Sequence, residues 1–422
     1  MGESVYWYKT KTVPGAPLRG TTTSDVVVVG GGMAGLTCAQ ALASRGVEVT
    51  VLERDFCGAG ASGKSSGFIT PDSELGLSDL VGRFGDARGT SLWEFAKSGI
   101  ERIRGAIAAH EIDCDYQVQD SIFVARSARA YRTLVEREHQ VQTSLGYQTT
   151  LYDRASIQTV VRSPRYYGGI RSSGTFGIDA YRYCRALKNA LERQGVRICE
   201  GTPAMRFTRA GVETPHGAVS ARAIAVFTDS DLPALGLAAP AVYGVRATLS
   251  ISQPLAEDEI RSVFPGNNLM VWDTDLVYQY FRVTGERRLL IGAGDVGSLY
   301  VQSAAASRRR IVRKQLRYLA SHFPSLRAVF EHTWSGVIGV SKDFAPVVGR
   351  HPADGRVYFA GAAAGLPWAA ALGEYIADKI TGGRDELDEL LSPQRTFVVS
   401  PRLQRIVGKP LGFAVSHGLA KL

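Results

Sequence analysis

The stretch DVVVVGGGMAGLTCAQALASRGVEVTVLE, residues 25–53, decides the fold of this chain of 422 residues. Its four consecutive valines, Val26–Val29, form an apolar β-branched run, which is typical of a strand buried on both faces of a parallel sheet. Three glycines follow, and small apolar residues then recur at helical spacing up to Gly46. Residues 47–52 are again apolar and β-branched. The stretch therefore predicts a strand, a glycine turn, a helix and a second parallel strand.

The glycines of this turn have the spacing of a dinucleotide-binding unit. Gly30 permits the tight turn, Gly32 lets the backbone approach a pyrophosphate, and Gly35 lets the helix pack closely on the strand. The pyrophosphate would rest on the helix N-terminus, where unpaired N–H groups and the helix dipole favour an anion. Glu53, at the tip of the second strand, is placed to accept hydrogen bonds from ribose hydroxyls. We therefore expect a bound dinucleotide.

The unit by itself does not distinguish NAD from FAD. Arg54 even permits NADP, because a guanidinium at that place can pair with a 2′-phosphate. The loop GAGASGKSSG, residues 58–67, decides the question, since it offers a second set of backbone amides and hydroxyls directly after the acid. A nicotinamide dehydrogenase does not need this loop, whereas the pyrophosphate and ribityl chain of FAD do. The sequence therefore predicts FAD.

Composition and charge narrow the class of protein further. Hydrophobic residues make up 45% of the chain and charged residues 21%, as in ordinary globular proteins. The net charge is +9, but the densest basic run, around Arg310, alternates with apolar residues at helical spacing. We interpret it as the solvated face of an amphipathic helix, so no nucleic acid is expected. The five cysteines and seven histidines are scattered without metal-ligand spacing, so no metal site is expected either.

The pattern of strands indicates two interleaved domains. Parallel-type strands near residues 25, 47, 196, 222 and 357 are separated by segments with antiparallel patterning. We expect an α/β fold in which a Rossmann-like FAD-binding domain is interleaved with a β-rich α+β substrate domain. The expected FAD-binding domain comprises residues 20–80, 150–235 and 336–389; the substrate domain comprises 81–149 and 236–335; a basic tail comprises 390–422.

Further motifs resemble the D-amino-acid oxidase, glycine oxidase and sarcosine oxidase superfamily of FAD enzymes. Residues 60–67 look like its Gly-Ala-Ser-Gly-Arg-Asn-Gly-Gly element. Residues 280–294 look like its Tyr-Phe-Arg…Arg-Leu-Leu-Phe-Gly-Gly-Gly segment, and residues 334–349 resemble its Trp-x-Gly…Asp…Pro-x-x-Gly signature. The resemblance spans residues 5–385 and is strongest to bacterial γ-glutamylputrescine-oxidase-like members.

The glycine turn, the second loop and this resemblance together imply a set of FAD contacts at turns and loop ends. We expect them at Gly30, Gly32, Met33, Ala34, Gly35, Glu53, Arg54, Gly60, Ala61, Ser62, Ser65, Ser66, Gly67, Ala204, Gly336, Gly361, Gly365, Leu366 and Pro367. Neither Cys nor His stands where relatives attach the flavin covalently, so the FAD is expected to be non-covalent. The chain departs from the family at the closing loop, residues 361–368, and at Thr228-Asp229-Ser230.

The resemblance implies an enzyme that oxidises the C–N bond of a small amine or amino acid by hydride transfer to the flavin. Arg282 could pair with a substrate carboxylate through its planar fork, or could be a cation on an exposed strand face. Trp368 could wall the substrate pocket and attract an ammonium through cation–π contact, with Tyr280 nearby on the same strand as Arg282. The positive net charge of the chain favours a substrate with an acidic end. Oxygen or a quinone would accept the electrons.

An alternative follows from the unusual closing loop: a non-catalytic FAD-binding subunit of a larger dehydrogenase complex, which passes electrons to a partner or a quinone. The basic tail adds a second open question. It contains no acid but carries Arg395, Arg402, Arg405 and Lys409 among apolar residues, so it could lie on an anionic membrane or dock on a partner. Packing against the rest of the chain is the other interpretation.

Localisation is expected to be cytoplasmic. No stretch approaches the ~20 apolar residues that span a bilayer. The N-terminus lacks the layout of a signal peptide, and the scattered cysteines are typical of reduced thiols. The final three residues, 420–422, resemble a peroxisomal address only weakly.

Overall fold

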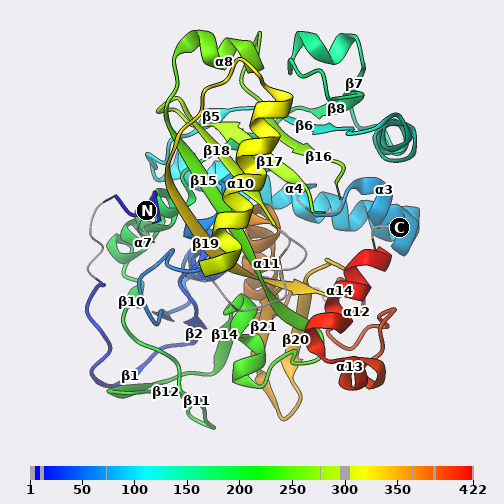
Figure 1. Ribbon diagram of the computed structural model, residues 1–422. Coiled ribbons are helices and arrows are strands. Elements are labelled where there is room, and N and C mark those ends of the chain that lie inside the picture. Colours follow the sequence, from blue (N-terminus) through cyan, green and yellow to red (C-terminus); the bar gives the residue numbers. More distant parts are fainter. Residues whose placement is uncertain are drawn as a thin grey trace.

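The computed structural model describes residues 5–9, 14–72, 74–275, 277–294, 305–363, 365–383 and 386–420. The last two residues of the weak peroxisomal address lie outside this part of the chain. Two large sheets dominate the described residues, with helices on their outer faces (Figure 1).

A six-stranded sheet forms the lower half of the molecule in Figure 1. Its strands stand in the order β10 (Arg197–Cys199), β3 (Val49–Leu52), β2 (Val26–Val29), β14 (Ala223–Val226), β21 (Asp354–Gly361) and β20 (Val347–His351). The first five are parallel and β20 is antiparallel to β21. The strand–turn–helix–strand unit expected from residues 25–53 is thus present, with α1 (Met33–Ala43) between β2 and β3.

Both faces of this sheet are covered, which explains its unbroken apolar strands. Val26 and Val28 point to one face, where α1, α4 (Asp86–Ala109) and α11 (Leu366–Ile380) pack. Val27 and Val29 point to the other face and meet the apolar side of a small sheet. That small sheet has the order β1 (Gly20–Thr23), β13 (Gly217–Ser220), β12 (Gly211–Thr214) and β11 (Arg206–Phe207).

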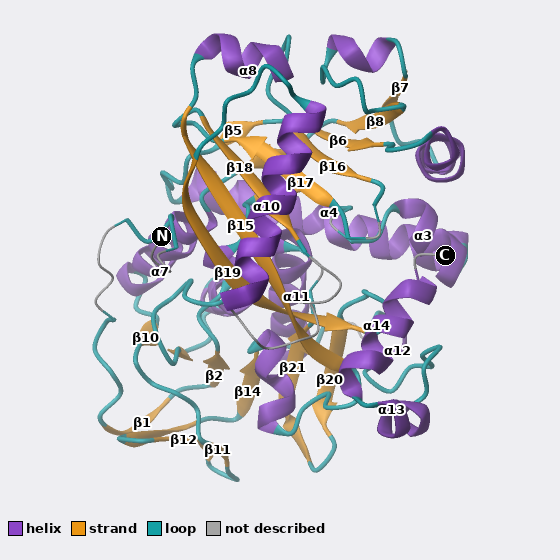
Figure 2. Ribbon diagram, in the orientation of Figure 1, coloured by secondary structure: helices purple, strands orange, loops and turns teal. Residues whose placement is uncertain are grey.

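An eight-stranded sheet forms the second layer. Its strands stand in the order β19 (Phe330–Ser341), β15 (Val242–Pro254), β18 (Arg288–Ala293), β17 (Gln279–Val283), β16 (Met270–Asp273), β6 (Ser121–Val124), β8 (Gly168–Ser172) and β7 (Thr149–Asp153). The basic amphipathic helix expected around Arg310 is α10 (Ala305–His322), which lies across one face of this sheet (Figure 2). There Leu319 and Phe323 pack on strand residues such as Phe281. The opposite face looks toward the six-stranded sheet.

The remaining elements connect these layers. They are α2 (Ala61–Lys64), β4 (Phe68–Ile69), α3 (Leu77–Phe84), β5 (Gln117–Val118), α5 (Ala128–Ala130), the π-helical turn Tyr131–Val135, α6 (Glu136–Ser144), the 3₁₀ turns Ser156–Thr159 and Asp229–Leu235, β9 (Phe176–Gly177), α7 (Ala180–Arg193), α8 (Glu257–Val263), α12 (Asp388–Leu391), α13 (Pro401–Val407) and α14 (Lys409–Ala420). Strands β4, β9 and β5 pair in a three-stranded sheet.

The fold class expected from the sequence is confirmed, and the sheets show where the expected segment boundaries differ from the strand pairing. Strands β7 and β8 pair in the eight-stranded sheet, although residues 150–235 were expected in the FAD-binding domain. Strand β19 crosses the expected boundary at residue 336. Helix α4, from the segment 81–149, packs on α11 in the core of the six-stranded sheet. Hydrophobic periodicity does not show which sheet each of these elements joins.

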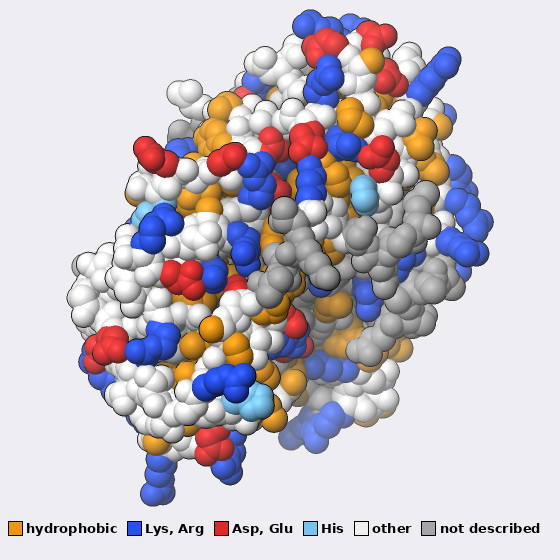
Figure 3. Space-filling view, turned by 90° about the vertical axis from the view of Figure 1, so that its left-hand side faces the viewer, with side chains coloured by type: hydrophobic (Ala, Val, Ile, Leu, Met, Phe, Trp, Pro, Cys, Tyr) orange, Lys and Arg blue, Asp and Glu red, His pale blue; other side chains and the backbone are white. Residues whose placement is uncertain are grey.

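Basic and acidic side chains are mixed on the face drawn in Figure 3, with apolar side chains between them. Several arginines of the chain stand in ion pairs, such as Arg288 with Glu331 and Arg206 with Glu213. Among the described helices, none is long and apolar enough to cross a membrane.

The contact between α4 and α11 gives a stability prediction. A Cβ built on Gly99 of α4 would lie 1.8 Å from the carbonyl oxygen of Pro367, so the two backbones touch there. Gly99→Ala should therefore force the helices apart and lower the free energy of unfolding by about 1–3 kcal/mol. Gly105→Ala, on the same helix, meets nothing within 4 Å and should instead raise stability by up to ~1 kcal/mol through helix propensity.

Urea or thermal unfolding of both variants measures the difference. Equal effects of the two substitutions would show that close packing at Gly99 does not hold the helices together.

Candidate functional site

A cavity of about 900 Å³ lies between the two large sheets. The carboxyl ends of β2, β3 and β14 form one end of it, which is where ligands bind in open parallel sheets. The face of the eight-stranded sheet opposite α10 forms its other end, with side chains from β15, β16 and β17. Its volume is at the upper end of the roughly 300–1,000 Å³ usual for ligand cavities.

The glycine turn has the geometry that a dinucleotide needs. Gly30 has a φ of +109°, and a Cβ there would lie 2.6 Å from the carbonyl oxygen of Phe227. A Cβ on Gly35 would lie 1.9 Å from the carbonyl oxygen of Gly30, so α1 packs directly on the turn. Gly32 faces the cavity and precedes the first helical residue without any side-chain cap. The N-terminus of α1 thus presents main-chain N–H groups to the cavity.

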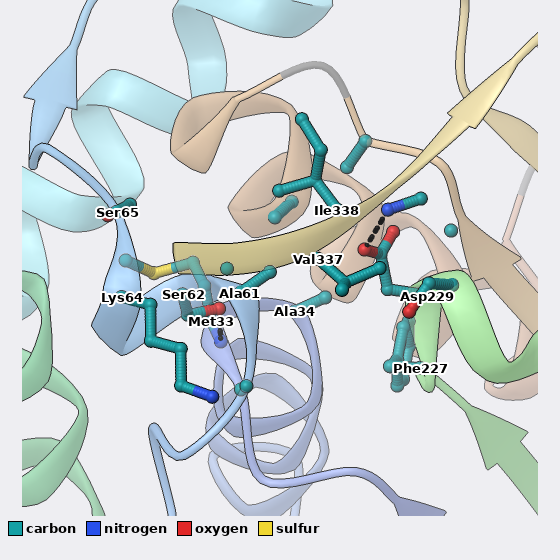
Figure 4. Close-up of a pocket in the computed structure, with 18 of the residues that line it drawn as sticks. Met33, Ala34, Ala61, Ser62, Lys64, Ser65, Phe227, Asp229, Val337 and Ile338 are labelled. Carbon is teal, nitrogen blue, oxygen red and sulfur yellow. Dashed lines mark hydrogen bonds between the residues drawn. The ribbon is translucent and has the colours of Figure 1, made fainter. Parts of the chain in front are cut away.

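We call the end of the cavity at the carboxyl ends of the parallel strands the dinucleotide end. Residues on both sides of the glycine turn complete it (Figure 4). The Met33 N–H donates to the Ser62 hydroxyl at 3.0 Å, which joins α1 to the second loop. The carboxylate of Glu53 accepts the N–H groups of Gly31 at 2.7 Å and Asp55 at 2.9 Å. Burial raises the pKa of this carboxyl group, and the two N–H donors act against that rise. Glu53 is therefore fixed in place at the cavity wall with lone pairs left for a ribose.

The second loop is held by its main chain. The carbonyl oxygen of Lys64 accepts the Trp334 indole N–H at 2.9 Å, and that of Ser65 accepts the Trp7 indole N–H at 2.9 Å. The carbonyl oxygen of Ser66 accepts Nε–H of Arg282 at 2.8 Å. Three consecutive carbonyl groups are therefore held by side chains from the N-terminus, β17 and β19.

Most residues expected to contact FAD line this cavity, and Tyr280 lines it too. The expected residues in the lining are Gly30, Gly32, Met33, Ala34, Glu53, Arg54, Gly60, Ala61, Ser62, Ser65, Ser66, Ala204, Gly336, Gly361, Gly365 and Leu366. Gly35, Gly67 and Pro367 lie outside the lining and shape the backbone behind it. A Cβ on Gly67, whose φ is +72°, would lie 1.8 Å from the carbonyl oxygen of Ile178.

The expectation that Arg282 reads a substrate carboxylate needs correction. Arg282 shares its sheet face with Tyr280, but its guanidinium is fully buried outside the cavity lining. It donates to the carbonyl oxygens of Ser66 and Ile178, at 2.8 and 2.7 Å. Burial lowers its pKa to about 10, so it stays charged at neutral pH. Arg282 joins β17 to the second loop and to the residue after β9.

The expectation that Trp368 walls the substrate pocket also needs correction. Leu366, Ala369 and Leu372 recur at helical spacing on the face of α11 that lines the cavity. Trp368 points from a different face, is 1% exposed and packs on Phe95 of α4 with ring centroids 5.8 Å apart. Trp368 stands one position before the lining residue Ala369, and one position on a helix turns a side chain by about 100°, here from the cavity into the core.

Sequence reasoning missed several lining residues. Asp229, with a φ of +49°, accepts the N–H groups of Gly339 at 2.6 Å and Ala362 at 3.0 Å. Burial raises the pKa of this carboxyl group. In the sequence, only the departure of Thr228-Asp229-Ser230 from the family's usual turn pointed to this residue. At the other end, Phe68, Glu74, Trp272 and Tyr278 line the cavity. Of these four residues, only Tyr278 could have been identified from the sequence, because it alternates with Tyr280 along the expected strand.

Fold and site together define a dinucleotide-binding protein whose ligand cavity lies between two sheets. The chain matches the family model described as DAO, FAD dependent oxidoreductase, over residues 25–379. It therefore belongs to this family of FAD-dependent oxidoreductases, which confirms the predictions of FAD and of an oxidoreductase. The glycine turn, the uncapped N-terminus of α1 and Glu53 fit FAD.

Similar proteins carry related descriptions. γ-Glutamylputrescine oxidoreductase of Escherichia coli is 28% identical over 389 residues, which is 90% of this chain and 88% of that protein. Probable oxidoreductase OrdL of Haemophilus influenzae is 27% identical over 384 residues, covering 88% and 86% of the two chains.

Solved structures share the fold. L-proline dehydrogenase from P. horikoshii has a TM-score of 0.75 at 21% identity, covering 89% of this chain and 98% of that one. Glycine oxidase from Geobacillus kaustophilus has a TM-score of 0.75 at 19% identity, covering 89% and 100%.

The buried position of Arg282 gives a prediction that separates its two interpretations. Arg282→Met should leave the carbonyl groups of Ser66 and Ile178 without this donor and lower stability by about 3–5 kcal/mol. FAD retention should fall with it, because Ser66 lines the cavity. The ratio of activity on an acidic amine to activity on its neutral analogue should not change.

The control is Arg206→Met, which removes an exposed arginine paired with Glu213 and should leave the melting temperature nearly unchanged. If Arg282→Met lost activity on the acidic amine but kept activity on the neutral analogue, Arg282 would after all bind a substrate carboxylate.

Proposed function

We propose that this protein oxidises the C–N bond of a small amine and that FAD, when bound, accepts the hydride. The observation that carries the proposal is the continuity of one cavity. It runs from the dinucleotide end at Gly32 and Glu53 to an aromatic end at Trp272, Tyr278 and Tyr280. The names of the relatives support an amine or amino acid as the substrate class.

The chain's own contribution is orientation and exclusion of water. The described lining contains neither His nor Cys, so no side chain of those types is available there as a base or as a point of covalent attachment. A neutral amine needs no strong base, since its nitrogen lone pair drives hydride loss from the neighbouring carbon. The aromatic end is suited to hold the amine in one orientation away from bulk water.

The proposal is tested by anaerobic reduction of the purified yellow protein. Across a panel of amines, amino acids, 2-hydroxy acids and sugars, at least one amine or amino acid should bleach the flavin absorbance, and the non-nitrogenous compounds should not. Bleaching only by non-nitrogenous compounds, or by dithionite alone, would contradict C–N oxidation.

Turnover of the same protein with oxygen or a soluble quinone addresses the alternative of a non-catalytic subunit. Steady turnover by the chain alone excludes that alternative. Bleaching without turnover supports a chain that passes its electrons to a partner protein.

A second proposal concerns the C-terminal helices: their outer face contacts an anionic membrane surface. The inner face packs on the chain itself. Phe413 is fully buried with Val245 and Val340, and Lys342 Nζ donates to the carbonyl oxygen of Val399 at 3.0 Å. His417 Nε2 lies 2.7 Å from the carbonyl oxygen of Ser341. On this face, the tail therefore packs against the rest of the chain, as one of the two interpretations of the sequence expects.

The outer face of α13 and α14 is apolar and basic. Its exposed apolar residues are Leu403, Ile406, Val407, Leu411, Val415 and Leu419, with Arg402 and Arg405 beside them. Residues 390–422 contain no acid that would repel a negatively charged surface. Apolar side chains flanked by arginines favour the interface of an anionic bilayer.

Co-sedimentation with vesicles tests this contact. The protein should bind phosphatidylglycerol vesicles more than phosphatidylcholine vesicles, and salt should weaken the binding. Ile406→Asp, at a position that is 82% exposed, should reduce it by roughly 10-fold, because it removes an apolar contact and adds a negative charge. Val118→Asp, at a 76% exposed position on β5, is the matched control and should bind normally. Equal binding by both variants would remove the membrane role.

A further inference from the structure

The end of the cavity under the eight-stranded sheet contains a carboxylate among aromatic rings. Glu74 lines this end, and its Oε1 accepts the Tyr278 hydroxyl at 2.8 Å. The rings of Tyr278 and Tyr280 have centroids 5.6 Å apart, and Tyr280 meets Phe68 edge-on at 5.8 Å. Trp272 stands opposite Tyr280 in the pairing of β16 with β17. We name these five residues the aromatic end.

The charged side chains that chiefly act on the two tyrosines of the aromatic end are acidic. Burial, followed by the charge of Glu74, raises the pKa of both Tyr278 and Tyr280 well above the usual range. Asp72 adds a smaller effect on Tyr278. No basic side chain contributes to either shift among the causes that act on these two tyrosines.

The basic side chains in the lining lie elsewhere in the cavity. They are Arg54, Lys64 and Arg246. Burial lowers the pKa of Lys64, and the charges that act on it further are those of Asp55, Arg54 and Arg246. Arg54 pairs with Asp231 at 2.7 Å, in the turn after β14. These cations therefore gather toward the dinucleotide end, and Arg282 is outside the cavity.

A carboxylate within a wall of aromatic rings is complementary to a cation. The ring faces attract an ammonium through their quadrupoles, and the carboxylate supplies a charge-assisted hydrogen bond. A substrate carboxylate at the same place would face the like charge of Glu74. The aromatic end therefore selects against an acidic substrate, contrary to the expectation from the net charge of the chain.

The cation at this end differs from the reacting nitrogen. Hydride leaves an amine whose nitrogen is neutral, and a carboxylate beside an ammonium raises its pKa and keeps it protonated. Glu74 would thus slow the reaction if it held the reacting nitrogen. It is suited to a second ammonium of the same molecule.

We propose that the aromatic end, with Glu74 at its centre, is a subsite for a second ammonium group, so that the preferred substrate is a diamine or polyamine. This inference rests on the proposed function. It adds a site for the far end of the substrate, which holds the molecule while the other nitrogen carries the bond that is oxidised.

The kinetic test compares substrates of equal length that differ only at the far end. Diamines from 1,3-diaminopropane to 1,6-diaminohexane are compared with the corresponding monoamines and ω-amino acids. The wild type should prefer a diamine. Glu74→Gln keeps an acceptor for the Tyr278 hydroxyl but removes the charge, so kcat/KM for that diamine should fall roughly 10- to 100-fold. The monoamine should change little.

Three variants frame this result. Glu257→Gln removes a 60% exposed carboxylate on α8 and should behave as wild type on every substrate. Tyr278→Phe keeps the ring and Glu74, so it should retain the preference for diamines. Trp272→Leu removes part of the ring wall and should lose part of that preference. Each variant is first checked for FAD content and melting temperature.

A binding measurement makes the test independent of turnover. Butyltrimethylammonium is a cation that cannot be oxidised in this way, because its nitrogen has no lone pair. It has no N–H to donate, so it probes charge and ring contacts alone. Calorimetry should show that it binds the FAD-loaded protein, that pentanoate binds far less, and that Glu74→Gln weakens the cation by roughly 10-fold.

The outcomes separate the two proposals. The subsite is overturned if Glu74→Gln lowers kcat/KM equally for monoamine and diamine, or if the wild type prefers the ω-amino acid. Amine oxidation itself then still stands. Glu74-dependent binding of the cation in a protein that oxidises no amine supports the subsite and overturns the proposed function.

Discussion

The hydrogen bonds to three consecutive carbonyl groups of the second loop are the constraint on which the rest of the site depends. Trp334, Trp7 and Arg282 donate to Lys64, Ser65 and Ser66. The donors come from the N-terminal segment, from β19 and from β17, while the acceptors stand in a loop of the parallel-sheet unit. Because these carbonyl groups are engaged from behind, the loop can turn its remaining polar groups toward the cavity. The buried guanidinium and the two indoles thus position the loop.

The sequence was most informative where one residue type alone satisfies the backbone. Gly30 and Gly35 could be placed in advance because a side chain at either would collide with main chain, and Glu53 followed from the strand that ends at it. Arg282 and Trp368 show the limit. Strand alternation placed Arg282 on the correct face of β17, but its neighbour across the interface, Ser66, is distant in sequence. Trp368 was expected in the pocket wall for its place after the glycines of the closing loop, but the lining residue is Ala369, one position on, and a single position on a helix turns a side chain by about 100°.

Bulk charge proved a poor guide to the charge of the cavity. The chain carries a net charge of +9, yet the aromatic end holds Glu74 and no basic side chain in the described lining nearby. Many of the arginines form ion pairs or donate to main-chain carbonyl groups. Arg395, for example, donates from two nitrogens to the carboxylate of Asp343 and also to the carbonyl oxygen of Ala345. A composition summed over the whole chain averages over such pairs and so conceals the sign of the field at one end of one cavity.

Asp229 limits how this molecule can open. Its two carboxylate oxygens accept N–H groups from Gly339, on a strand of the eight-stranded sheet, and from Ala362, directly after a strand of the six-stranded sheet. Rotating one sheet against the other would strip a buried carboxylate of a donor on one side, at a cost that no exposed contact would offset. Asp229 therefore acts as a tie that opposes separation of the two sheets on the dinucleotide side of the cavity.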